Sequence, residues 1–181
     1  MHDTRSARLR EFQERLTERL RHATAAPVAA RLAMIAGERG YLVDLAEAGE
    51  IVPVPPSFAT VPMTQPWFRG LINLRGAPTA VSDLSMFAGG AAVEITKEAR
   101  VLAFSPRLAL NAGLLVSRIQ GLKALDALRE TGQGGPAAGE AAQSAGECWL
   151  GRTWADDTGR LWRELSLQQL ALDERFLTIA R

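Results

Sequence analysis

The residue in this sequence with the clearest need for an oppositely charged partner is an arginine within a hydrophobic stretch. Arg75 lies in the run Asn73-Leu74-Arg75-Gly76, directly after a short apolar segment. A guanidinium should not be buried without a partner, and its planar array of donors suits a carboxylate. Glu50 and Asp83 are the candidate carboxylates, and Gly76 permits a turn directly after the arginine. Spacing alone therefore favours a structural salt bridge between Arg75 and one of these two acids.

Residues that usually perform catalysis or bind metals are scarce. Cys148 is the single cysteine, and the two histidines, His2 and His22, both lie near the amino terminus. These residues lack the spacing of metal ligands, and a serine or cysteine nucleophile would lack a positioned base. Asp156 and Asp157 form a carboxylate pair, but their surroundings are typical of a turn. We expect no metal, no cofactor and no enzyme activity; a hydrolase that uses the two aspartates is the competing hypothesis.

Three tryptophans, Trp149, Trp154 and Trp162, lie close together along the chain. We interpret them as packing residues of a core or a sheet edge. Aromatic rings beside arginine can also stack on bases, so the alternative function is a small β-barrel module that binds single-stranded nucleic acid or another protein. The chain has 21 basic and 20 acidic residues, and this balance argues against binding to nucleic acid through bulk charge.

The length of 181 residues, of which 47% are hydrophobic, is enough for a core without disulfide bonds. No apolar run approaches the ~20 residues of a membrane span, and the polar amino terminus lacks the apolar core of a signal peptide. We therefore predict a cytoplasmic protein that does not insert directly into a membrane.

Two segments depart from the pattern of the rest. Residues 1–27 predict an amphipathic helix, because apolar residues recur at spacings of three and four and Pro27 cannot continue a helix. This helix would either pack on its own domain or bind a partner. Residues 131–146 are rich in Gly, Ala and Gln and almost devoid of bulky side chains, which predicts a disordered loop.

Short apolar runs separated by turn residues dominate the remaining sequence. Residues 31–35 and 41–45 flank the turn-forming residues 37–40, which predicts a β-hairpin. Asp83 can cap a short helical turn, and Ser166 can cap a final helix. Many short strands with turns between them indicate a mainly β protein, a small barrel or a sandwich.

The run from Trp67 to Gly76 resembles the signature of CheW-like domains. The residues that match the signature are Gly70, Asn73, Leu74, Arg75 and Gly76. Val81-Ser82-Asp83-Leu84 matches the strand that follows in the family, although Ser82 replaces a usual apolar residue. The resemblance implies two five-stranded SH3-like β-barrels that share a core. This CheW-like domain would span residues 28–178, with the amino-terminal amphipathic helix before it and a short carboxyl-terminal helix at its end.

The resemblance also implies an adaptor without catalysis. Members of the family link the cytoplasmic tip of a methyl-accepting chemoreceptor to the regulatory domain of a CheA-type histidine kinase, in arrays of membrane-bound receptors. The segment Gln65-Pro66-Trp67, the run from Gly159 to Leu165 and the amino-terminal helix resemble the branch that serves type IV pilus (twitching motility) systems.

Site residues follow from the same resemblance. Arg75 and Glu50 would form the ion pair that shapes a receptor-binding groove. The candidate residues in or beside that groove are Val54, Val116 and Ser117. Residues 61–68 match the region that faces the kinase, and the candidates there are Val61, Pro62, Trp67 and Phe68.

Overall fold

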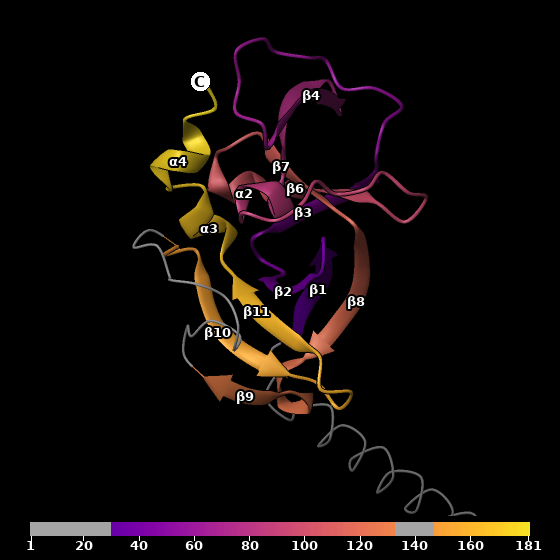
Figure 1. The fold of residues 1–181 in the computed structure, drawn as a ribbon, viewed down its shortest axis with the longest axis vertical. Coiled ribbons are helices and arrows are strands. Elements are labelled where there is room, and N and C mark those ends of the chain that lie inside the picture. Colours follow the sequence, from indigo (N-terminus) through magenta and orange to yellow (C-terminus); the bar gives the residue numbers. More distant parts are fainter. Residues whose placement is uncertain (1–29, 133–146) are drawn as a thin grey trace, which may run out of the picture.

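The computed structural model describes residues 30–132 and 147–181. The predicted helix over residues 1–27 lies outside this part, and so does the predicted loop over residues 131–146, apart from Thr131 and Gly132. The described chain is mainly β, as predicted, with two sheets and a few short helices. In Figure 1 the five-stranded sheet lies above the six-stranded sheet, and helices α3 and α4 lie along one side.

The six-stranded sheet joins strands from both ends of the described chain, in the order β8-β1-β2-β11-β10-β9. In that order the strands are Arg118–Ala124, Ala30–Ala36, Arg39–Asp44, Leu161–Leu165, Leu150–Ala155 and Arg129–Gly132. Strands β1 and β2 form the predicted hairpin, and Gly37 at its turn has a φ of 59°, which favours glycine. Strand β11 pairs with β2 in parallel, with Arg163 opposite Tyr41.

The five-stranded sheet has the order β3-β6-β7-β5-β4. In that order the strands are Ala48–Pro53, Arg100–Phe104, Ala112–Val116, Ala77–Asp83 and Phe68–Leu74. The helical elements are α2 (Leu84–Phe87), α3 (Leu167–Leu170), α4 (Glu174–Leu177) and the 3-10 turns η1 (Pro106–Leu108) and η2 (Leu125–Ala127).

Two details differ from the expected pair of five-stranded barrels with one final helix. The first sheet has a sixth strand, β9, because Thr131 and Gly132 belong to a strand rather than to the predicted loop. Thr131 Oγ1 donates to the carbonyl of Thr153 on β10 over 3.1 Å, which helps to hold this edge. The final helix is split, because Ser166 caps α3 as predicted and Asp173 then caps α4 separately.

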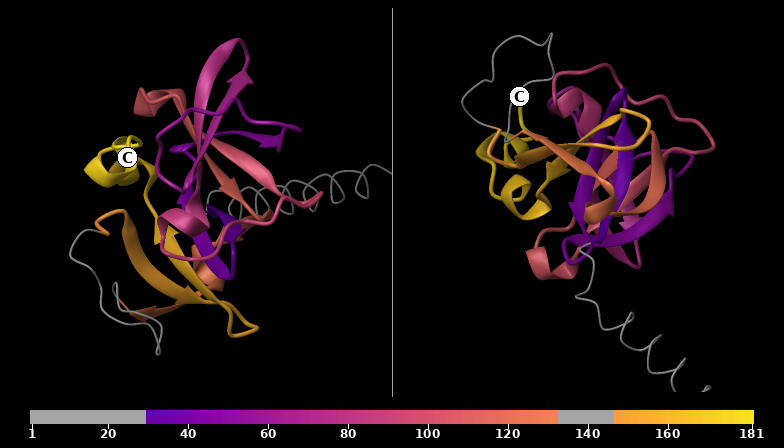
Figure 2. Two further views of the ribbon diagram at one scale, coloured as in Figure 1. Left: turned by 45° about the horizontal axis from the view of Figure 1, so that its top comes forward. Right: turned by 90° about the horizontal axis from the view of Figure 1, so that it is seen from below.

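The main core lies between the two sheets and is shared by them, as predicted. It contains Leu32 and Met34 from β1 and Leu165 from β11, together with Leu102 from β6 and Leu114 from β7. Its other members include side chains of α3 and α4, which Figure 2 shows in yellow beside the strands. Because side chains alternate along a strand, the intervening residues of β1 and β7 enter two smaller clusters, one within each sheet.

Candidate functional site

The turn between β4 and β5 presents the arginine of the signature run. Leu74 pairs with Ala77, so the loop of this hairpin consists of Arg75 and Gly76 alone. Their φ angles are 51° and 85°, the left-handed pair of a type I′ turn, in which asparagine and glycine are the favoured residues. Asn73 Oδ1 accepts a hydrogen bond of 2.8 Å from the Gly76 amide and holds the loop. An arginine at the first loop position is therefore sterically unfavourable, and such outliers cluster at functional sites.

Arg75 forms an ion pair with Glu50 on β3. Arg75 Nε donates to Glu50 Oε2 over 2.7 Å, and the side chains are 81% and 37% exposed. The other candidate carboxylate, Asp83, is buried and accepts hydrogen bonds from the amides of Met86 and Val93. Spacing alone left the partner of Arg75 open, whereas the family resemblance implied Glu50, and Glu50 is its partner in the structure.

This ion pair connects opposite edges of the five-stranded sheet. Strand β3, which carries Glu50, is one edge, and β4, which leads into Arg75, is the other. The sheet thus curls so far that its edge strands are joined through side chains. Both residues line a cavity of about 450 Å³ beside the pair. Its other lining residues include Gly49, Leu74, Thr79, Phe104, Leu110 and Asn111.

Gly70 brings a loop segment against the edge of β4. Its φ is 123°, and a Cβ atom at this position would lie 2.5 Å from the carbonyl oxygen of Ala59. Ala59 and Leu71 exchange two backbone hydrogen bonds of 2.8 and 2.9 Å beside it. The glycine of the signature run is therefore required for close backbone approach as well as for its positive φ.

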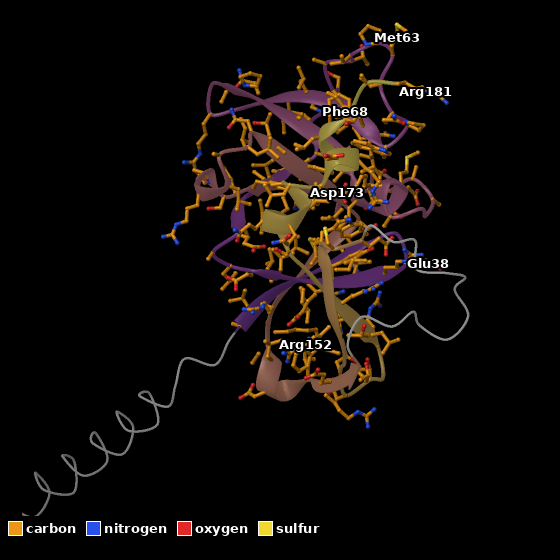
Figure 3. The ribbon with its side chains drawn as sticks, turned by 90° about the vertical axis from the view of Figure 1, so that its left-hand side faces the viewer. Glu38, Met63, Phe68, Arg152, Asp173 and Arg181 are labelled. Atoms are coloured by element: carbon orange, nitrogen blue, oxygen red, sulfur yellow. The ribbon has the colours of Figure 1, made fainter. Side chains whose placement is uncertain are left out.

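The carboxyl-terminal tail holds the segment before β4, a contact that the sequence did not predict. The Gln65 amide donates to the Ile179 carbonyl over 2.8 Å, and Gln65 Nε2 donates to the Ala180 carbonyl over 3.1 Å. The Arg181 amide donates to the Met63 carbonyl over 2.9 Å, and Figure 3 shows these two residues together at one end of the molecule. No local pattern signals this contact, because 115 residues separate Gln65 from Ala180.

The comparison that decides the family covers most of the described chain. The family model of the CheW-like domain matches residues 32–173, from β1 to the residue that caps α4. The chain belongs to the CheW-like domain family.

Two proteins show how this CheW-like chain relates to others. Protein PilI of Pseudomonas aeruginosa is 30% identical over 87 residues, which are 48% of this chain and 48% of PilI. The match thus spans about half the length of that relative. The crystal structure of the scaffolding protein TtCheW from Thermoanaerobacter tengcongensis is similar with a TM-score of 0.59 at 20% identity, over 77% of this chain and 89% of that chain. The second similarity shows a shared fold.

The groove residues expected in this CheW-like domain differ in how much surface they offer. Val116, at the end of β7, is completely buried in the main core, so it cannot contact a partner without unfolding. Ser117 is half-buried, and its Oγ accepts a hydrogen bond of 3.0 Å from the Gly37 amide. Val54 is half-buried against the smaller cluster of the five-stranded sheet. Val116 can therefore support such a groove only from behind its surface, because both faces of β7 are covered.

The kinase-facing candidates also differ in how much surface they expose. Phe68 is buried in β4, and Trp67 is half-buried, with its ring 5.1 Å from that of Phe87 and 5.9 Å from that of Phe176. Both aromatic residues therefore serve packing. Val61 is half-buried and Pro62 is exposed, so these two retain surface for a partner.

The tryptophans near the carboxyl end offer no open platform for bases. Trp149 lies in the main core and Trp162 in the cluster of the six-stranded sheet, and both are buried. Trp154 is half-buried and lies opposite Trp162 in the register of β10 and β11. These positions agree with their interpretation as packing residues.

Asp156 is held by hydrogen bonds that explain its place in the turn between β10 and β11. Its Oδ1 accepts from the amide and hydroxyl of Thr158 and from the Arg160 amide, at 2.6–3.1 Å. Its Oδ2 accepts from Trp162 Nε1 over 2.8 Å and from Lys123 Nζ over 3.3 Å. The hydrogen bonds from Thr158 and Trp162 hold the pKa of Asp156 well below its usual range. Such a carboxylate stays ionised and suits a structural role better than acid catalysis.

The described residues contain no group of three or more His, Cys, Asp or Glu side chains that could hold a metal ion. In the same part of the chain, no helix is both long and apolar enough to cross a bilayer.

Proposed function

We propose that this CheW-like protein is an adaptor without catalytic activity that couples the cytoplasmic tip of a chemoreceptor to a CheA-type histidine kinase, with type IV pilus motility as its output. Family membership supports the adaptor role, and the similarity to PilI supports the pilus pathway. The observation that carries the proposal is the exposed guanidinium of Arg75, which a strained turn and Glu50 hold at the rim of a cavity.

The receptor side of the proposal rests on the surface around Arg75. The ion pair with Glu50 uses Nε, and the side chain remains 81% exposed. An exposed ion pair contributes only about 0–1 kcal/mol to folding, so stability does not account for an arginine at this position of the turn. Binding does account for it, since arginine is enriched among the residues that dominate protein interfaces.

The kinase side of the proposal rests on the segment that the tail holds. Pro62 is exposed, and Met63 next to it is 81% exposed. The backbone there is nevertheless fixed by the hydrogen bonds to Ile179, Ala180 and Arg181. A preorganised apolar surface loses less conformational entropy on binding than a mobile one, which favours its use as an interface.

The two sides can be tested separately with purified full-length protein, receptor-tip fragments and the regulatory domain of the kinase. Replacing Arg75→Ala should weaken receptor binding about tenfold and leave kinase binding unchanged, whereas Met63→Glu should do the reverse. Arg129→Ala and Leu122→Glu are matched controls, because both residues are exposed on the six-stranded sheet. Isothermal titration calorimetry measures both affinities. A folded protein that binds neither fragment would refute the proposal.

A further inference from the structure

A cavity of about 320 Å³ opens on the six-stranded sheet, where β2 and β11 begin. These two strands are parallel, so their first residues meet at the same edge of the sheet. Residues from distant parts of the chain, such as Arg39 and Arg160, therefore line one cavity. Its other lining residues are Glu38, Gly40, Tyr41, Leu150, Thr153, Leu161, Trp162 and Arg163.

Three polar side chains form a row along the wall of this cavity. Thr153 lies opposite Arg163 in the register of β10 and β11, and Arg163 lies opposite Tyr41 on β2. Thr153 Oγ1, Arg163 Nε and Arg160 Nε are buried and find no hydrogen-bond partner within residues 30–132 and 147–181. Tyr41 Oη is also buried and lies beside the Arg39 guanidinium, which can only donate, so the phenol hydrogen has no acceptor there. Buried polar atoms are nearly always hydrogen-bonded, so four unmatched donors around one cavity indicate a missing acceptor.

The charge of the lining has the sign that this acceptor requires. Three arginines, Arg39, Arg160 and Arg163, face one acidic residue, Glu38. Arg160 is fixed in place, because it donates to the Glu38 carbonyl over 3.4 Å and its guanidinium lies 5.5 Å from the centre of the Trp162 ring. Burial raises the pKa of Tyr41, so its phenol stays protonated and can donate at neutral pH.

We propose that this cavity binds a small molecule through a carboxylate or phosphate group, which accepts hydrogen bonds from Tyr41, Arg163 and Thr153. Arginine suits both groups, because its planar donors match their paired oxygen atoms. Leu150 and Leu161 offer apolar contact to the remainder of the ligand. The volume lies at the lower end of small-molecule sites, which fits a metabolite-sized ligand. The site belongs to the six-stranded sheet and Arg75 to the five-stranded sheet, so ligand binding requires neither the receptor nor the kinase.

Titration of the full-length protein with simple anions tests this site. Inorganic phosphate and citrate are the probes, and chloride at equal ionic strength is the control. Saturable NMR shifts of the Gly40 amide and the Trp162 indole are expected for at least one probe and not for chloride. Saturation by phosphate alone assigns a phosphate group, and saturation by citrate alone assigns a carboxylate. Absence of saturable shifts with both probes overturns the proposal.

Two variants then test whether the probe binds in this cavity. Tyr41→Phe and Arg163→Gln should each weaken the binding of the active probe about tenfold, because each removes one donor. Arg107→Gln makes the same change of charge at an exposed residue outside the cavity and should stay within about twofold of wild type. Tyr41→Phe keeps the aromatic ring that packs in the main core, so the variant should remain folded, and its melting temperature checks this. Wild-type affinity in both cavity variants would overturn the proposal.

Discussion

Replacing Asp156→Ala should destabilise the protein by about 3 kcal/mol, through the loss of a carboxylate that organises the turn between β10 and β11. The largest contribution comes from Trp162, which is buried and donates to Asp156 Oδ2 over 2.8 Å. A buried donor left without its acceptor costs about 1–3 kcal/mol. Lys123 loses its ion pair, whereas Thr158 and the Arg160 amide can bond partly to water.

Asp156→Asn removes the negative charge of the side chain and keeps nearly the same shape. Asparagine keeps one acceptor oxygen for Thr158 and Arg160, but it places an amide group opposite Trp162 Nε1 and Lys123 Nζ, which are both donors. We expect a loss of about 2 kcal/mol. The control is Asp157→Asn, because Asp157 is the exposed neighbour, and this change should stay within about 0.5 kcal/mol of wild type.

The effect should depend on pH. The folded state holds the pKa of Asp156 below its unfolded value, so the carboxylate stabilises the fold above about pH 4. This stability is lost as the pH falls toward the folded pKa. The difference in the free energy of unfolding between wild type and Asp156→Asn should therefore stay constant above about pH 5 and shrink as the pH falls from about 5 to about 2.

Urea denaturation followed by tryptophan fluorescence measures these free energies at each pH. If Asp156→Asn and Asp157→Asn proved equally stable at neutral pH, the hydrogen bonds to Trp162 and Lys123 would not contribute as the structure indicates. A constant difference across the acidic range would contradict the assignment of the titrating group.

Three further predictions concern the five-stranded sheet and the tail. Gly70→Ala should lower the stability of the fold by more than about 2 kcal/mol, because the new Cβ atom would meet the Ala59 carbonyl. Gly76→Ala should lower it by only about 1 kcal/mol, because no atom lies within 4 Å of the new Cβ atom. Thermal melts of the two variants compare these losses. A double-mutant cycle of Arg75→Asn and Glu50→Gln should give a coupling of at most about 1 kcal/mol, and a value above about 2 kcal/mol would contradict the exposed geometry. Deleting residues 179–181 should speed hydrogen exchange at the Gln65 amide. The control is the Asp83 amide, which donates to the Trp67 carbonyl and should exchange as before. An unchanged exchange rate at Gln65 would show that the tail does not hold the segment.

Local sequence patterns were sufficient for features that depend on neighbouring residues. The β1–β2 hairpin follows from alternating apolar runs around Gly37, and the caps at Asp83 and Ser166 follow from their side-chain chemistry. The sequence also indicated that Arg75 needs a carboxylate. Spacing alone could not choose between Glu50 and Asp83, because that choice depends on how far the five-stranded sheet curls; Glu50 was indicated only by the family resemblance.

The sequence alone did not predict features that depend on contacts between residues far apart along the chain. The complete burial of Val116 was not apparent, because one sequence does not show that the second sheet covers β7. Thr131 and Gly132 looked like loop residues because they begin a segment almost devoid of bulky side chains. Only the pairing of β9 with β10 places them in a strand. The tail contact at Gln65 joins two segments of unremarkable composition. In each case the deciding partner lies far away along the chain.

The strand orders have a consequence for the sequence of folding events during synthesis. The five-stranded sheet uses one uninterrupted stretch, residues 48–116, and can assemble as soon as that stretch is available. The six-stranded sheet cannot be completed until β11 is made, because β11 lies between β2 and β10. During that interval β2 keeps an unpaired edge, and such edges are prone to aggregate. Slow translation between β2 and β11 would prolong this exposure, so the nascent protein should depend most on chaperones at that stage.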